Sequence, residues 1–120
     1  MEAVVEKQNI IKDKSFGFAL KIIELSMLLK KDHNYEIASQ ILRSGTSIGA
    51  NVEEAQAAQS KRDFVSKLSI SSKEARETKY WLRLIKESKL ANKEVDELMK
   101  DCDELINILT KIVKTSSQNI

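Results

Sequence analysis

Basic side chains at helical spacing are the first feature of this 120-residue chain that could do chemistry. Residues 61–93 contain ten Lys or Arg and four Asp or Glu, a net charge of +6, whereas the whole chain carries only +2. The residues that advance along this segment by three or four positions, called here the basic ridge, are Lys73, Arg76, Lys79, Arg83 and Lys86. Such a ridge suits the phosphates of a nucleic-acid backbone, and a solvated helix face has the same pattern.

A second set of residues is polar where a packed helix would place apolar side chains. Two interpretations stay open: a solvated face, or a network between helices or subunits in which Arg43 meets Glu74 or Glu77. In that network the amide of Asn51 would specify the register of the helices, and Arg43→Ala would cause a large loss of stability. The structural or interface candidates are Arg43, Ser47, Asn51, Glu54, Glu74, Glu77 and Trp81.

The single tryptophan, Trp81, stands next to Tyr80 and has two candidate roles. Its spacing from Ile70 and Glu77 takes it off the apolar stripe that contains Leu82. It could stack on a base or fill an interface. Proteins that bind single strands interleave several aromatic residues with basic ones, so the sequence favours packing or a subunit interface for Trp81.

Catalytic constellations are not evident in the sequence. The only histidine, His33, falls in a polar break, and no glutamate lies three residues before it, as a di-metal site of a four-helix bundle would need. No glycine-rich phosphate loop follows a strand. We therefore expect no catalytic residue, no metal, no cofactor and no enzymatic activity.

The lone cysteine and the absence of long apolar runs bear on the compartment. Cys102 excludes an intramolecular disulfide, fits a reducing compartment and is expected to be a buried, unreactive thiol. Residues 1–12 lack the apolar segment of a signal peptide, and no run approaches the roughly 20 apolar residues that span a bilayer. We expect a cytoplasmic protein that has no contact with a membrane.

Apolar residues at helical period predict four helices in a single domain that covers residues 1–120. The chain has three glycines and no proline, and the predicted helices cover residues 15–31, 35–59, 60–85 and 92–114. Residues 1–13 and 115–120 are expected to be frayed. Short breaks between the helices favour an all-α, antiparallel up-down-up-down four-helix bundle. The first stripe is so broad that it should contact more than one neighbour.

Small and polar residues mark particular positions within these helices. Gly45 and Gly49 lie inside the second helix, where each glycine costs about 1 kcal/mol relative to alanine, so a close helix approach is expected there. Asn34 and Asn92 are candidate N-caps of the second and fourth helices. Ser60 and Asp63 have the spacing of a capping box at the start of the third.

Several of these positions together form a family signature. It consists of residues 43–51, which read RSGTSIGAN, with Glu54-Ala55, Ser60, Asp63-Phe64, Lys67, Lys73-Glu74, Glu77 and Tyr80-Trp81-Leu82 downstream, and Lys14-Ser15-Phe16 with Phe18-Ala19 upstream. The pattern covers roughly residues 10–115. It resembles the signature of the four-helix bundle proteins called 23S rRNA-intervening sequence proteins.

The resemblance implies a small bacterial protein, in some cases encoded within insertions in large-subunit rRNA genes. A related group, the accessory variability determinants of diversity-generating retroelements, forms a pentameric ring and binds nucleic acid beside a reverse transcriptase. By analogy we expect a homo-oligomer, with a pentameric ring favoured, and RNA or DNA and a protein such as a reverse transcriptase as partners. The resemblance attaches no catalytic role to the signature residues.

The leading hypothesis is a non-enzymatic oligomeric bundle that binds structured nucleic acid through the basic ridge, without evident base-edge readout. The alternative is a protein-interaction scaffold or accessory subunit that does not bind nucleic acid directly.

Overall fold

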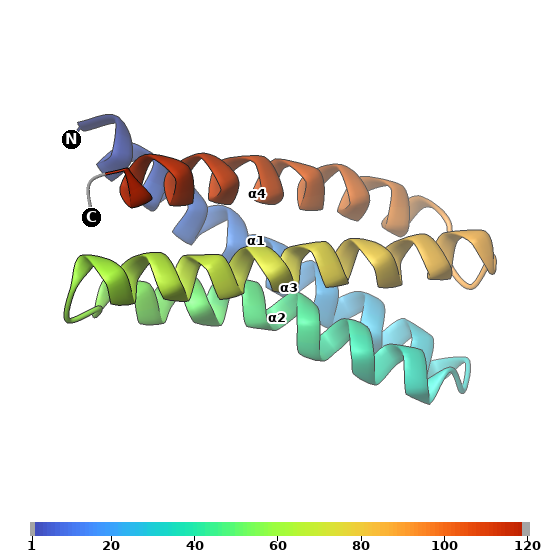
Figure 1. The fold of residues 1–120 in the computed structure, drawn as a ribbon. Helices are drawn as coiled ribbons and strands as arrows, with labels where there is room; N and C mark the ends of the chain where they lie inside the picture. The colour runs from blue at the N-terminus through green and yellow to red at the C-terminus, as the bar shows by residue number, and fades with distance from the viewer. Residues whose placement is uncertain (1, 119–120) are drawn as a thin grey trace.

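Four antiparallel helices form the molecule. The computed structural model describes residues 2–118 and the side chains of residues 9–118. Its helices are α1 (Glu2–Lys31), α2 (Tyr35–Gln56), α3 (Lys61–Glu87) and α4 (Lys93–Ser117). Successive helices are joined at alternate ends of the bundle and run in opposite directions (Figure 1). Each helix packs against two neighbours, in the order α1, α2, α3, α4 and back to α1. The predicted all-α, up-down-up-down four-helix bundle is confirmed.

The first and last helices are longer than the sequence pattern predicted. α1 begins at Glu2 and not at Ser15, and Ile11 on it is fully buried. Ile11 continues the buried face of α1 through Phe18, Ile22, Leu25 and Leu29, so the core extends into the segment 1–13 that was expected to be frayed. α4 ends at Ser117 and not at Lys114, and Ser116 is buried. Residues 1, 119 and 120, also expected to be frayed, lie outside the described residues.

The glycines of α2 allow α1 to approach closely, as predicted. A Cβ atom at Gly45 would lie 2.8 Å from both Cγ1 and Cγ2 of Ile22, and one at Gly49 would lie 3.3 Å from the carbonyl oxygen of Ser15. Larger residues at these two positions would separate the helices. The close approach of α1 therefore accounts for two residues that are poor helix formers.

Helix ends are set by one side-chain cap and two backbone motifs. Ser60 has an extended backbone, and its Oγ accepts a hydrogen bond from the Asp63 N–H at 3.0 Å, so the predicted cap of α3 is confirmed. The predicted caps at Asn34 and Asn92 are wrong, because neither side chain bonds its helix. Instead, α1 and α3 end in Schellman motifs, in which the N–H groups of Asn34 and Leu90 bond carbonyl oxygens five residues back. His33 (φ 65°) and Lys89 (φ 60°) are the left-handed residues of these two motifs.

Candidate nucleic-acid interface

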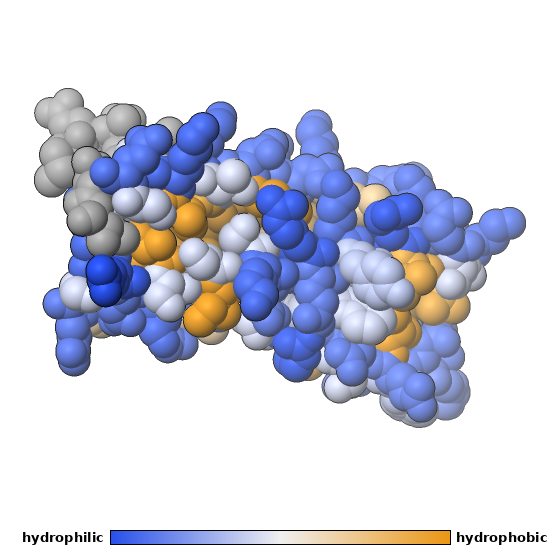
Figure 2. Space-filling model, in the orientation of Figure 1, coloured by the Kyte–Doolittle hydropathy of each residue, from blue (hydrophilic) through white to orange (hydrophobic). Residues whose placement is uncertain are grey.

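The basic ridge lies on α3, which is helical without interruption from Lys61 to Glu87. The opposite side of this helix is buried in the core through Leu68, Ala75 and Leu82, which directs the ridge toward solvent and toward α4. Figure 2 shows hydrophilic side chains over much of the face formed by α3 and α4, with an apolar area between them near the start of α3. The helix thus presents a cationic edge beside α4.

Acidic residues of α4 neutralise part of the basic ridge. Lys79 pairs with Asp103 and Lys86 pairs with Asp96, each at 2.7 Å. The hydrogen bond that Lys86 donates to Asp96 raises the pKa of Lys86 above its ordinary value. No described side chain forms an ion pair with the other three members, called here the free cations: Lys73, Arg76 and Arg83. The expected ridge of five cations is therefore reduced to three free ones.

A groove separates the basic ridge from α4, called here the α3–α4 groove. Its volume is about 520 Å³, and its lining residues are Arg76, Lys79, Tyr80 and Arg83 on α3 and Asp103, Ile106 and Asn107 on α4. Tyr80 is 54% exposed, and its ring meets that of Trp81 edge-on at a centroid distance of 5.3 Å. Ile106 is 9% exposed. Tyr80 and Asn107 were not among the predicted site residues, although the position of Tyr80 between Arg76 and Arg83 could have indicated it.

Arg43 of α2 meets both carboxylates that the sequence offered it on α3. Its guanidinium pairs with Glu74 at 3.1 Å and with Glu77, whose carboxylate also accepts a hydrogen bond from the Trp81 indole N–H at 2.9 Å. The predicted inter-helix network is present at these residues. The Arg43 side chain nevertheless stays 49% exposed. The large loss of stability expected for Arg43→Ala assumed that the side chain is buried. Because the side chain is half exposed, we expect only a modest loss of stability.

The remaining polar residues of α2 do not join α3 in the predicted way. Asn51 Nδ2 donates to the carbonyl oxygen of Ser47 at 2.9 Å, and Ser47 Oγ donates to the carbonyl oxygen of Arg43 at 2.6 Å. Both bonds stay within one helix, as is common for short polar side chains, so within this chain the Asn51 amide does not link α2 to α3. Glu54 does reach α3 through an exposed ion pair with Lys67 at 3.1 Å.

An apolar stripe on α1 faces away from the core. Its members, Phe16, Leu20, Ile23 and Met27, recur every three or four residues and are between 40% and 66% exposed. The broad apolar stripe in the sequence of this helix was expected to contact more than one neighbour. Within this chain, these four residues of the stripe lie on the surface. Contiguous apolar surface of this kind marks interaction sites.

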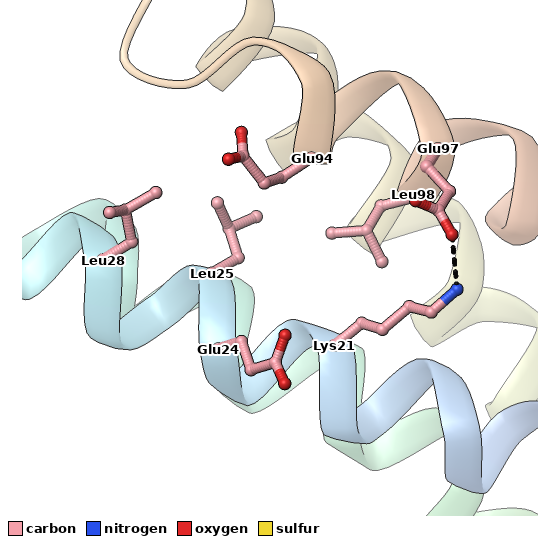
Figure 3. Close-up of a pocket in the computed structure, with 7 residues that line it drawn as sticks. All are labelled: Lys21, Glu24, Leu25, Leu28, Glu94, Glu97 and Leu98. Atoms are coloured by element: carbon pink, nitrogen blue, oxygen red, sulfur yellow. Dashed lines mark hydrogen bonds and ion pairs between the residues drawn. The ribbon is translucent and has the colours of Figure 1, made fainter.

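A cleft between α1 and α4 has the opposite electrostatic character to the basic ridge. Leu25 of α1 and Leu98 of α4 point into it, and glutamates stand at its rim (Figure 3). Lys21 bonds Glu97 at 2.7 Å, which lowers the pKa of Glu97 and raises that of Lys21. Carboxylates at the rim repel phosphates, so this cleft is not part of the candidate interface. No group of three or more potential metal ligands occurs within the described part of the chain.

Cys102 lies in the core, as expected from its isolation in the sequence. Its thiol is fully buried and donates to the carbonyl oxygen of Ala75 at 3.1 Å. Burial raises the pKa of this thiol to about 12. The thiolate needed for nucleophilic chemistry is therefore scarce at neutral pH.

Within residues 2–118, no helix combines the length and the apolar character that a membrane crossing requires.

The fold and its surfaces define a small all-helical bundle in which α3 carries a partly neutralised basic edge. Within that class, the model of the family described as "23S rRNA-intervening sequence protein" matches residues 7–111, and the chain belongs to this family. A crystal structure of a protein of unknown function from the S23 ribosomal protein family of Bacteroides thetaiotaomicron VPI-5482 is similar to it. The two sequences are 44% identical, the TM-score is 0.86, and the match covers 90% of this chain and 98% of that one. No curated protein matches the sequence.

Proposed function

We propose that this protein is a non-enzymatic, oligomeric helical bundle that binds RNA or DNA through the basic ridge of α3. The observation that carries the proposal is the pair of arginines on its exposed edge, Arg76 and Arg83, which form no ion pair with any described side chain. Guanidinium groups that already bind carboxylates would have to exchange partners before binding phosphates. These two arginines need no such exchange.

Binding through these groups is electrostatic, because each phosphate neutralised by a cation releases condensed counterions. Lys79 and Lys86 contribute less than the arginines, since Asp103 and Asp96 already hold them at 2.7 Å. A single chain supplies few free cations. Repetition of the ridge around a symmetry axis would multiply the positive field and make binding of a long polyanion favourable.

Self-association is the second part of the proposal, and the apolar stripe of α1 supports it. Phe16 is 66% exposed and Met27 is 65% exposed, and a second copy of the chain would remove both from water. By analogy with the related accessory proteins, the proposed oligomer is a pentameric ring. The proposed location of this protein is the cytoplasm. On this view the stripe serves assembly and the basic ridge serves binding.

Salt-dependent binding of labelled RNA and DNA tests the proposal. The double variant Arg76→Gln/Arg83→Gln should bind more weakly and reduce the magnitude of the slope of log K against log salt by about two for each subunit that contacts the nucleic acid. Lys111→Gln/Lys114→Gln changes two exposed lysines of α4 outside the α3–α4 groove, removes the same net charge and is the matched control, with a smaller effect. Charge reversal at Arg76, Lys79 and Arg83 should abolish binding. Wild-type affinity in that triple variant would refute the site.

A protein-interaction scaffold is the second candidate, and the exposed stripe of α1 also favours it. In that case the stripe would dock a partner such as a reverse transcriptase, and nucleic acid would be bound incidentally or not at all. Co-purification of one protein that survives nuclease and high salt would support the scaffold. Salt-sensitive binding of the purified chain to a mixed nucleic-acid pool would support the leading proposal.

A further inference from the structure

The α3–α4 groove combines an exposed aromatic ring with free cations on both sides of it. Arg76 precedes Tyr80 by four residues and Arg83 follows it by three, so both lie one helical turn from the ring. At a rise of 1.5 Å per residue, the two arginines are about 10 Å apart along α3. We propose that this groove binds an unpaired nucleotide of single-stranded RNA or DNA, with its base stacked on Tyr80.

The groove offers a suitable environment for a base. Its volume of about 520 Å³ lies within the range of roughly 300–1,000 Å³ typical of ligand sites. Ile106 of α4 supplies an apolar side chain to the groove, and Tyr80 is 54% exposed, so its ring is available for stacking. Asn107 adds an exposed amide that can donate to and accept from a base edge.

The charges around the ring suit the phosphates on either side of the stacked base. Arg76 and Arg83 provide planar donor groups that bind phosphate oxygens in pairs. Asp103, the acidic residue of the groove, is held by Lys79 at 2.7 Å, which offsets its repulsion of a nucleotide. Bases inside a duplex are stacked on each other and cannot reach Tyr80. The groove therefore selects unpaired segments, including loops of a folded RNA.

This inference rests on the proposed function, because it uses the same arginines of the basic ridge. It adds base stacking and a preference for single strands, neither of which a purely electrostatic surface would show. The test therefore compares single strands that carry equal phosphate charge and differ in their bases, and adds a duplex that carries about twice that charge.

The experiment measures fluorescence anisotropy with labelled dT12 and U12, an abasic 12-mer and a 12-bp duplex, at one salt concentration. Wild type should bind the two single strands more tightly than the abasic strand or the duplex. Tyr80→Leu should weaken single-strand binding about 5- to 100-fold and leave abasic binding unchanged. Tyr80→Phe should retain the wild-type affinity. Tyr35→Leu is the matched control, because Tyr35 is 57% exposed and lies outside the groove.

The wild-type protein provides a second readout that does not depend on any variant folding. Trp81 is the only tryptophan and contacts the Tyr80 ring, so a base stacked there should change Trp81 emission. The abasic strand should leave this emission unchanged. Equal affinity for the base-containing and abasic strands, with no emission change, would overturn the stacking site while leaving the electrostatic proposal intact. Failure of every polyanion to bind would overturn both.

Discussion

A substitution at Gly45 tests the close packing of α1 on α2. In a helix interior, replacing glycine by alanine gains about 1 kcal/mol of stability when the added methyl group meets nothing. Gly17 on α1 is such a site, because a Cβ there would have no heavy atom within 4 Å outside its own stretch of helix backbone. At Gly45 the same methyl group would lie 2.8 Å from two carbons of Ile22, a fully buried side chain. The two changes are chemically identical and differ only in surroundings.

The expected magnitudes follow from those distances. Carbon atoms pack best at about 3.5–4.0 Å, so the methyl group at Gly45 would overlap Ile22 by roughly 1 Å. Overpacking of this kind costs about 1–3 kcal/mol. Subtracting the gain in helix propensity leaves a net loss of about 1 kcal/mol for Gly45→Ala. Gly17→Ala should gain up to about 1 kcal/mol, so the two variants differ by about 2 kcal/mol.

Urea unfolding followed by circular dichroism measures both variants, at one protein concentration because association would change the apparent stability. A double-mutant cycle with Ile22→Ala isolates the contact, since that change removes both overlapping carbons. In the Ile22→Ala background, Gly45→Ala should become stabilising. A gain at Gly45 equal to that at Gly17, in the wild-type background, would refute the reasoning.

Three further outcomes are expected of single residues. Arg43→Ala should lower the free energy of unfolding by only about 1 kcal/mol, measured in urea, because the Arg43 side chain is 49% exposed. A loss above about 3 kcal/mol would mean that association of the chains buries Arg43. Ser60→Ala should lose about 1 kcal/mol of stability, because it removes the cap bond of α3. Asn92→Ala removes no cap bond and should change the stability little. Equal losses in the two variants would contradict the assignment of the caps. Cys102 should resist a thiol reagent at pH 8 in the native state and react after denaturation, and rapid native labelling would contradict its burial.

Apolar period and residue type were sufficient to predict much of this fold. The close approach at Gly45 could be predicted because two glycines inside a helix need a compensating contact. The pairing of Arg43 with Glu74 and Glu77 could be predicted because neighbouring helices in a bundle place such rows side by side. The start of α1 could not, because charges near Ile11 interrupt the apolar period even though that side chain is buried.

The candidate interface was only partly predictable, because it depends on how α3 and α4 are aligned. Neither the neutralisation of Lys79 by Asp103 nor the position of Asn107 across from Tyr80 follows from spacing along one helix. The Asn51 amide does not link two helices of this chain, because it bonds the backbone of its own helix. Sequence patterns locate charges on a helix face, whereas the alignment of two helices decides which charges stay free.

The contact between α1 and α4 sets the way in which the bundle can open. It is less extensive than the other three helix contacts, and exposed ion pairs from Lys14 and Lys21 border it. It also joins the two segments that are furthest apart in the sequence, so its formation closes the longest loop of the chain. Partial unfolding should therefore start along this contact, with the extensively packed α2–α3 pair acting as the hinge.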